Sequence, residues 1–360
     1  MIQSCDVGSL PYIDKLDKLV EGANHYTAGL SDDSAGFFEQ TIVRAFLDKL
    51  DTGIDVAAFP QFRGMNEMFL STFGGIEKTK SGYVETGRLA LSPKQGKIPE
   101  VAVIEKNAAK VHAQRDSPFQ LRICITGPYT LASFFPYRTS RTYTQLGQVL
   151  SEIVKKNIFA VKHGKVALVS VDEPLFGLVD EPLIDRGTEG RENLLSAWEL
   201  LTNEAKSKSA ATCIHLHHTA DDLFWSVRSL GIVESHVDDP LYEMQVTKKR
   251  LEKEDKLLKA SIAITDFDHL IKEKLGSAMS DDAIAEAWRN ISNGKLNPKT
   301  FLENVHVMKK RLAKIIERFG LERVVFAGPE CGLRGFPTYA SAISCLNQVS
   351  KAVKSISKSC

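Results

Sequence analysis

The sequence predicts a single (β/α)8 barrel, the α/β fold class in which eight parallel strands alternate with helices. Three observations indicate this fold. Eight short apolar segments recur along the chain, helical patterns alternate with them, and each segment ends in polar residues, glycine or proline. A length of 360 residues suits one barrel with insertions, and no repeat, low-complexity tract or linker divides it. We therefore expect one domain over residues 1–360, with its site at the carboxyl ends of the strands.

The predicted elements follow in chain order. Short runs rich in branched apolar residues predict strands at 2–7, 54–59, 121–125, 166–171, 213–219, 233–237, 257–264 and 323–327. Apolar residues at helical spacing predict helices at about 13–23, 35–51, 145–163, 191–208, 220–230, 280–319 and 337–355. The less regular segment at about 70–105 predicts an excursion or hairpin at the mouth of the barrel.

Composition and charge exclude several classes of protein. Hydrophobic residues make up 43% of the chain and charged residues 25%, as in ordinary soluble globular proteins. A net charge of +1 gives no global field to attract nucleic acid or an anionic membrane, so neither is an expected partner. There is no signal-peptide pattern and no run of about 18 apolar residues that would span a membrane. Six scattered cysteines form no disulfide framework, and we expect reduced thiols in the cytoplasm.

The strongest functional signal is the histidine-rich end of the fifth predicted strand. His215 and His217 alternate with apolar residues, so they share one side of the strand. A lone histidine on a strand is usually a hydrogen-bonded core or surface residue, whereas two at this spacing are candidate metal ligands. Zinc accepts imidazole, thiolate and carboxylate ligands, so Asp238 and Cys331, at the ends of the sixth and eighth strands, would complete the set. Read singly, Asp238 also fits a helix N-cap, and Cys331 also fits a small apolar filler.

Two adjacent carboxylates follow the fourth predicted strand. Asp172 and Glu173 are placed to bind a substrate amine or to transfer protons, although helix capping also explains them. Other polar side chains that would meet at the barrel mouth are Ser9, Gln61, Arg63, Glu67, Thr126 and Asp268. The glycines form tight turns, such as Gly8-Ser9 and Gly127-Pro128, and no glycine-rich phosphate loop, so we expect no nucleotide site.

Five motifs at the predicted strand ends occur together. They are Val7-Gly8-Ser9, Thr126-Gly127-Pro128-Tyr129-Thr130, Val171-Asp172-Glu173-Pro174, His215-Leu216-His217 and Pro329-Glu330-Cys331-Gly332-Leu333. In this order they resemble the catalytic C-terminal barrel of cobalamin-independent methionine synthase, and the resemblance covers nearly the whole chain. The wider superfamily includes uroporphyrinogen decarboxylase and corrinoid-dependent methyltransferases. The resemblance implies a zinc-dependent methyltransferase that moves a methyl group to the thiol of homocysteine and forms methionine.

The resemblance also implies roles for single residues. The family's zinc ligands map to His215, His217, Asp238 and Cys331. The carboxylate that grips the homocysteine amine maps to Asp172, and the turn that holds the homocysteine carboxylate maps to Gly8 and Ser9. We place Gln61 and Thr126 in the same substrate-binding set. A family histidine that assists proton transfer falls near Asp268, with His269 next to it.

Several positions depart from the family pattern. His217 stands where the family usually has cysteine, with His218 as the fallback ligand, and Asp238 stands for a glutamate, with Glu234 as the second choice. Phe134 falls near a tryptophan expected against a folate ring, and the N-terminal barrel of the long family members is absent. A methyl-corrinoid, as methylcobalamin or on a protein, therefore suits this chain better than methyl-folate or another methyl-pterin. The alternatives are transfer to another thiol such as coenzyme M, a uroporphyrinogen decarboxylase-like reaction without metal, and a non-catalytic barrel that binds a partner protein.

Overall fold

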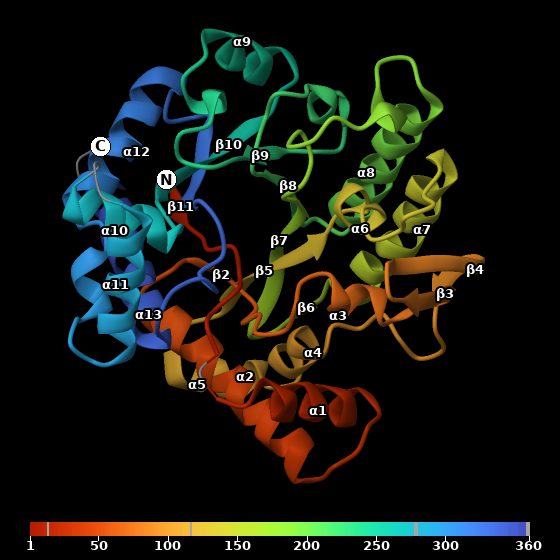
Figure 1. Cartoon of the computed structure of the whole chain (residues 1–360), viewed down its shortest axis with the longest axis horizontal. Coiled ribbons are helices and arrows are strands. Elements are labelled where there is room, and N and C mark those ends of the chain that lie inside the picture. The colour runs from red at the N-terminus through yellow and green to blue at the C-terminus, as the bar shows by residue number, and fades with distance from the viewer. Residues whose placement is uncertain (13, 116, 277–279, 358–360) are drawn as a thin grey trace.

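The computed structural model describes residues 1–12, 14–115, 117–276 and 280–357. Eight parallel strands form a barrel surrounded by helices (Figure 1), which confirms the predicted (β/α)8 fold. The barrel strands are β1 (Gln3–Ser4), β2 (Val56–Ala58), β5 (Phe119–Thr126), β7 (Gly164–Glu173), β8 (Ala211–Leu216), β9 (Ile232–Glu234), β10 (Leu257–Ala263) and β11 (Val324–Pro329). Their order around the barrel is β1-β11-β10-β9-β8-β7-β5-β2. Each of the eight predicted strands overlaps one of them.

The barrel closes at a seam between β1 and β2, where backbone pairing is sparse. Within the described residues, the two sides of this seam meet through isolated bridges from Cys5 to Val56 and from Ser9 to Gln61. The second bridge brings two of the predicted substrate-binding residues side by side at the carboxyl end of the barrel.

Two buried charged side chains reinforce this seam. Lys49 Nζ donates to Asp6 Oδ2 at 2.7 Å and to the carbonyl oxygens of Gly8 and Ala58 at 2.8 Å and 3.1 Å. Asp6 Oδ1 accepts from the Ala58 amide at 2.6 Å. The ion pair therefore joins the segment after β1 to β2, and it holds the turn that carries Ser9.

The residues along the inward-facing side of the strands change from apolar to polar toward the mouth. A small apolar cluster of Cys5, Val56, Leu168, Cys213, Ile232 and Phe326 lies lowest. Since side chains two residues apart point the same way, β7 continues inward with Ser170 and Asp172, and β8 continues with His215 and His217. The interior of the barrel is thus apolar in its lower layer and polar at the carboxyl ends of the strands.

Local sequence explains where several outer helices begin and end. In the described part of the chain the longer helices are α1 (Leu16–Thr27), α2 (Asp33–Asp51), α4 (Pro99–Lys106), α5 (Ala108–Arg115), α7 (Ser140–Asn157), α8 (Glu189–Ser207), α9 (Gln245–Lys253), α10 (Phe267–Leu275), α11 (Asp281–Ser292), α12 (Val305–Phe319) and α13 (Tyr339–Ser357). The side chains of Thr188 and Asn304 accept from first-turn amides at the starts of α8 and α12. Gly320, at a φ of +89°, ends α12.

Two predicted helices differ from the structure. The predicted helix 220–230 is wrong, because a short 3-10 turn at Leu223–Ser226 lies there instead. The Asp221 carboxylate accepts from the Leu223 amide at 2.7 Å and pairs with Arg191, which holds this segment in a turn. The predicted helical segment 280–319 is divided into α11 and α12, since Gly294 takes a φ of +70° and a 3-10 turn follows it.

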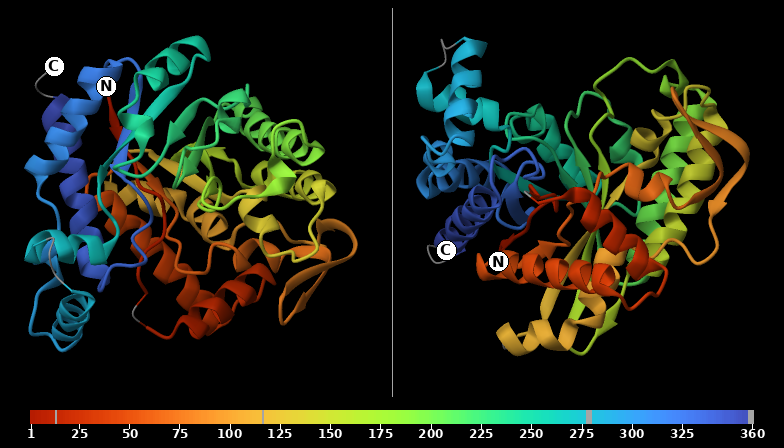
Figure 2. Two further views of the ribbon diagram at one scale, coloured as in Figure 1. Left: turned by 45° about the horizontal axis from the view of Figure 1, so that its top comes forward. Right: turned by 60° about the horizontal axis from the view of Figure 1, so that its bottom comes forward.

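The excursion predicted at about 70–105 contains a hairpin. Strands β3 (Phe73–Thr79) and β4 (Gly82–Leu91) pair antiparallel at the periphery of the molecule, beside α7 (Figures 1 and 2). The Tyr83 amide donates to the Phe134 carbonyl at 2.7 Å, and the Leu89 amide donates to Gln145 Oε1 at 3.0 Å. These bonds attach the hairpin to the loop after β5 and to α7. The remaining short elements include α3 (Glu67–Leu70), α6 (Pro128–Ala132) and β6 (Ala160–Val161).

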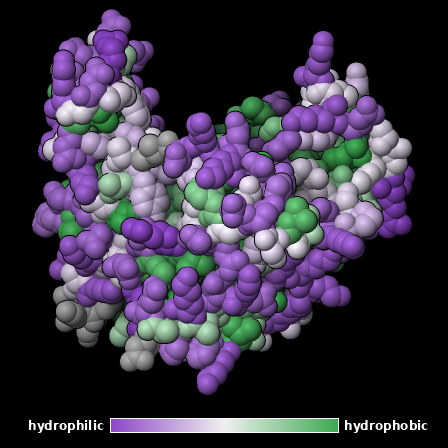
Figure 3. Space-filling view, turned by 90° about the horizontal axis from the view of Figure 1, so that it is seen from below, coloured by the Kyte–Doolittle hydropathy of each residue, from purple (hydrophilic) through white to green (hydrophobic). Residues whose placement is uncertain are grey.

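The surface and the helices of the described residues can be compared with the needs of a membrane span. The face seen in Figure 3 is mainly hydrophilic, with apolar residues in small groups. In the part of the chain that the structure describes, no helix has the length and apolar character to cross a membrane. The described cysteines are all free thiols, and Cys360 lies outside the described residues.

Candidate metal centre

Three imidazoles and one thiol converge at the carboxyl ends of the barrel strands. His215 and His217 come from the end of β8, His236 follows β9 by two residues, and Cys331 follows β11 by two residues. Their potential ligand atoms all lie within 4.8 Å of one another. Cys331 Sγ lies 3.4 Å from His217 Nε2. Nitrogen and sulfur donors at this spacing form a set that could hold a metal ion such as zinc.

Three imidazole nitrogens of this group make no hydrogen bond within the described structure. They are His215 Nδ1, which lies 2.6 Å from a Glu234 oxygen, and the Nε2 atoms of His215 and His236. A buried polar atom without a partner costs free energy, so such atoms are rare in folded proteins. A bound cation would satisfy both Nε2 atoms, and their position therefore fits a metal site.

The local electrostatics favour the ligand forms of Cys331 and His217 but the charged form of His215. Burial alone would raise the pKa of the Cys331 thiol, but its contacts with His215, His217 and His236 hold that pKa well below its usual value. Burial lowers the pKa of His217, which keeps its imidazole neutral. For His215, burial acts in the same direction, but the Glu234 carboxylate dominates and raises the pKa to about 9.

Asp238, one of the four predicted ligands, does not join this group. It lies exposed in the turn that follows β9, and His236 takes the corresponding place. The strand pairing ends at Glu234, so the alternation of sides cannot be extended as far as residue 238. His236 was missed, although it lies on the same side as Glu234 and nearer to the strand end. His218, the fallback ligand, is also exposed and outside the group.

A pocket of about 280 Å³ opens beside the four side chains. Its lining includes Ser9, Gln61, Arg63, Met65, Asp172, His215, His217, Cys331 and Arg334. Gly332 lets Ser9 approach closely. A Cβ atom at position 332 would lie only 1.9 Å from Ser9 Oγ. The structure thus brings the predicted residues Ser9, Gln61 and Asp172 to one pocket with the imidazoles and the thiol. Arg334 was not predicted as a site residue.

Gly8 and Thr126, also predicted to bind substrate, are not among the residues that line this pocket. Gly8 has a φ of +117°, which favours glycine, and it shapes the turn that presents Ser9. Thr126 Oγ1 donates to the Met65 carbonyl at 2.8 Å, and Met65 lines the pocket. These two residues shape the site rather than face it.

The adjacent carboxylates after β7 have different surroundings. Asp172 lines the pocket, and its Oδ1 accepts from Ser170 Oγ at 2.6 Å. Burial raises the pKa of Asp172 to about 6, against the lowering effects of His215 and Arg122.

Glu173 instead supports the helix that follows β5. Its carboxylate accepts from the Tyr129 and Thr130 amides at 2.9 Å and 2.7 Å, at the start of α6, and from Trp198 Nε1 at 2.7 Å. The helix-capping interpretation therefore holds for Glu173.

Asp268 lies apart from the metal-binding group. It is exposed in the first turn of α10, and its Oδ1 accepts from Trp288 Nε1 at 2.6 Å. His269 is nearer, since it lines an outer pocket together with His217 and His236. The structure therefore does not bring Asp268 together with Asp172 and Cys331.

Two other polar residues expected at the mouth are engaged in ion pairs. Arg63 lines the pocket but is paired with Glu100 through two bonds of 2.7 Å. Glu67 is paired with Lys78 and accepts from Tyr83 OH, beside the hairpin. Neither side chain is free to act as the main charge for a substrate.

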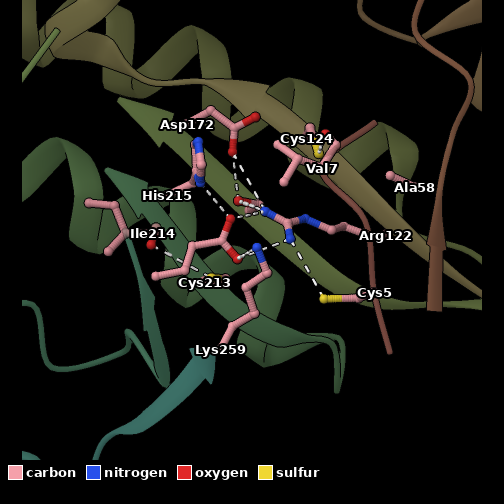
Figure 4. A network of polar contacts seen from close by, with 12 residues as sticks. Cys5, Val7, Ala58, Arg122, Cys124, Asp172, Cys213, Ile214, His215 and Lys259 are labelled. Carbon is pink, nitrogen blue, oxygen red and sulfur yellow. Dashed lines mark hydrogen bonds and ion pairs between the residues drawn. The ribbon is translucent and has the colours of Figure 1, made fainter. Parts of the chain in front are cut away.

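Buried charged side chains, among them Arg122 and Lys259, gather beside His215 and Asp172 (Figure 4). Glu234 is fully buried and accepts from Arg122 Nη1 and Nη2 at 3.1 Å and 2.8 Å. Lys259 Nζ lies 3.5 Å from the same carboxylate, and His215 Nδ1 lies 2.6 Å from it. Although burial raises the pKa of Glu234, Arg122 and Lys259 hold it well below the usual range. The carboxylate is thus a buried anion with three partners.

Comparison with known proteins identifies structural relatives of this barrel. No protein-family model matches the chain, and no curated protein matches it by sequence. The chain is similar to a B12-independent methionine synthase from Shewanella sp. W3-18-1 in complex with selenomethionine, with a TM-score of 0.62, 13% identity, and coverage of 100% of this chain and 98% of that chain. It is also similar to a candidate vitamin B12-independent methionine synthase from Listeria monocytogenes, with a TM-score of 0.58, 14% identity, and coverage of 99% of both chains. At such identities, the likeness shows that the chain shares the barrel fold of these structures.

Proposed function

We propose that this chain is a zinc-dependent methyltransferase that moves a methyl group to the thiol of homocysteine and forms methionine. The observation that carries the proposal is the group of His215, His217, His236 and Cys331 beside a pocket that also contains Asp172. The fold shared with the two methionine synthase structures supports it. Such a protein would be a soluble enzyme of the cytoplasm.

The four side chains fit zinc because they offer three imidazole nitrogens and one sulfur. Bound there, zinc would keep a substrate thiol in its nucleophilic thiolate form at neutral pH. His215, His217, His236 and Cys331 would hold the ion, and the pocket beside them would admit the substrate thiol. His236 was not predicted as a ligand from the sequence. Zinc content of a His236→Ala variant tests directly whether it binds the metal.

The pocket offers a charged partner for each end of an amino acid. We assign the substrate amine to Asp172, whose carboxylate is held by Ser170. The substrate carboxylate would lie at the Gly8-Ser9 turn, with Arg334 as a nearby cation and Gln61 on the same wall. This arrangement favours homocysteine over a thiol that lacks the amine.

The assignment of the methyl donor rests on one position of the sequence. We favour a methyl-corrinoid, either methylcobalamin or a methyl-corrinoid protein, over methyl-folate or another methyl-pterin. The support is that Phe134, rather than tryptophan, falls at the position expected to stack on a folate ring, and its carbonyl is used to hold the hairpin.

A combined metal and transfer assay tests the proposal. Purified protein should contain about one zinc per chain and should form methionine from homocysteine with at least one of these donors. Protein without zinc, together with full activity of Cys331→Ser, would disprove the metal-dependent reaction. Transfer only to a thiol without an amine, such as coenzyme M, would move the function to the rival acceptor class.

A further inference from the structure

The buried carboxylate of Glu234 links two parts of the candidate site. It lies on β9, two residues before His236, and its oxygens contact the two terminal nitrogens of Arg122 and Nδ1 of His215. Glu234 is fully buried, so these partners replace the water that the charge would otherwise require. A carboxylate in this position could turn to a metal only by giving up its contacts with the buried cations Arg122 and Lys259.

The contact with His215 determines which imidazole nitrogen is free. His215 Nδ1 lies 2.6 Å from Glu234 Oε1, although the ring is not in line with that oxygen for a regular hydrogen bond. The contact places Nδ1 against the carboxylate and leaves the buried Nε2 toward the other ligands. A histidine binds a metal through one unprotonated nitrogen, and the hydrogen bond of the other nitrogen fixes both tautomer and ring orientation.

The same network reaches the substrate side of the pocket. Arg122 Nη2 donates to Ser170 Oγ at 2.9 Å, and Ser170 Oγ donates to Asp172 Oδ1 at 2.6 Å. Through this chain, the orientation of Asp172 depends on the position of Arg122, which Glu234 holds.

A second branch leads to the thiol. Lys259 Nζ donates to the Pro329 carbonyl at 2.5 Å, two residues before Cys331. The strand end that carries the thiol is thereby tied to the same buried carboxylate.

We infer that Glu234 is a positioning residue and not a metal ligand: it holds His215 with Nε2 toward the metal and, through Arg122 and Ser170, orients Asp172. The inference rests on the metal site of the proposed function. It assigns the ligand role to His236, which is two residues after Glu234. Arg122 and Lys259 hold the Glu234 carboxylate in place.

Zinc affinity of the metal-free protein tests this inference. Glu234→Gln keeps the shape of the side chain but removes its charge, and we expect the dissociation constant for zinc to rise by about 10- to 100-fold, as for other partners of metal-bound histidines. The affinity is measured by competition with a chromogenic chelator. In a His215→Ala background, adding Glu234→Gln should change the affinity by less than about twofold, because the carboxylate would have lost the residue through which it acts.

Nitrogen NMR of the histidines gives a readout independent of activity. In metal-free protein, the nitrogen chemical shifts of His215 should differ between the wild type and Glu234→Gln, because the carboxylate that contacts Nδ1 is lost. If Glu234→Gln does not fold, Glu234→Gln combined with Lys259→Met removes one buried cation along with the anion and should show the same loss of zinc affinity.

Ser170→Ala serves as the matched control. It removes the hydroxyl that bridges Arg122 and Asp172, leaving only their direct ion pair at 4.0 Å, and it keeps the contact between Glu234 and His215. The zinc affinity should therefore stay unchanged while the KM for homocysteine rises. Unchanged zinc affinity in Glu234→Gln, or an equal loss of affinity in the His215→Ala background, would overturn the positioning role. Wild-type protein that binds no zinc would overturn the proposed function as well, which separates the two failures.

Discussion

Replacing Asp172 with asparagine separates recognition of the substrate amine from the rest of the reaction. The change keeps the side-chain shape, and the Ser170 hydroxyl can still donate to the retained oxygen, as it does to Oδ1 at 2.6 Å. The lost quantity is the charge that would face the ammonium group of homocysteine. Asp172 is almost fully buried, so this contact would be weakly screened by water.

The size of the effect follows from this geometry. One carboxylate oxygen is already occupied by Ser170, which leaves a single charge-assisted contact for the amine. Such a contact is worth roughly 1.5–3 kcal/mol. Because each 1.4 kcal/mol is a factor of ten, the KM for homocysteine should rise by about ten- to a hundredfold in Asp172→Asn.

The assay compares two thiols in wild-type and variant protein. Homocysteine is measured beside the analogue that lacks only the amine, with methylcobalamin and with methyl-folate as donors, and zinc content is determined in parallel. The wild type should use the analogue poorly. The activity of Asp172→Asn toward the analogue should be only slightly lower than that of the wild type. Equal losses for both thiols would refute the reasoning, since Asp172 would then serve the fold or the chemistry and not recognition.

Three further predictions concern the metal and the structure around it. Cys331→Ser should lose most of the bound zinc while its thermal unfolding stays close to that of the wild type; retention of zinc by the variant would argue against the thiolate ligand. In Gly127→Ala the new Cβ would lie 2.2 Å from the Glu173 carboxyl carbon, so the free energy of unfolding in urea should fall by about 1–3 kcal/mol, and an unchanged value would contradict the close approach. Burial raises the pKa of Glu173 to about 7, above its usual value of 4.5, so its stabilising contribution is full below about pH 4.5 and is lost as the pH rises through 7. Urea unfolding between pH 5 and 8 should therefore show the wild type losing stability relative to Glu173→Gln, and a constant difference would exclude this titration.

The strands could be predicted because their signal is local. Branched apolar residues and the alternation of sides marked β8, and the same alternation put His215 and His217 on one face. Cys331 was found from its place after the last strand. These residues needed only the sequence and the geometry of a parallel barrel.

The rest of the site depends on contacts that are distant in sequence. The end of β9, which decides between His236 and Asp238, is fixed by Tyr242, whose hydroxyl contacts the Ser235 backbone and the Lys259 carbonyl. The roles of Arg122 and Lys259 were also missed, because a charged residue within a strand ordinarily suggests an exposed position. Arg122 and Lys259 lie between buried apolar neighbours on their strands, and this pattern could have indicated that both are buried.

The sparse seam between β1 and β2 has a consequence for how the chain reaches its native state. The pairing of β1 with β11 joins Gln3 to Phe326, so this contact requires closure of nearly the whole chain and belongs to a late step of folding. Until then β2 and β11 expose unpaired edges, which other chains can capture. The contact between Lys49 and Asp6 spans only 43 residues and can form earlier, holding the N-terminal segment on β2 before β11 arrives. Loss of Lys49 should therefore appear first as aggregation during refolding, increasing with protein concentration, and a yield independent of concentration would argue against this order of events.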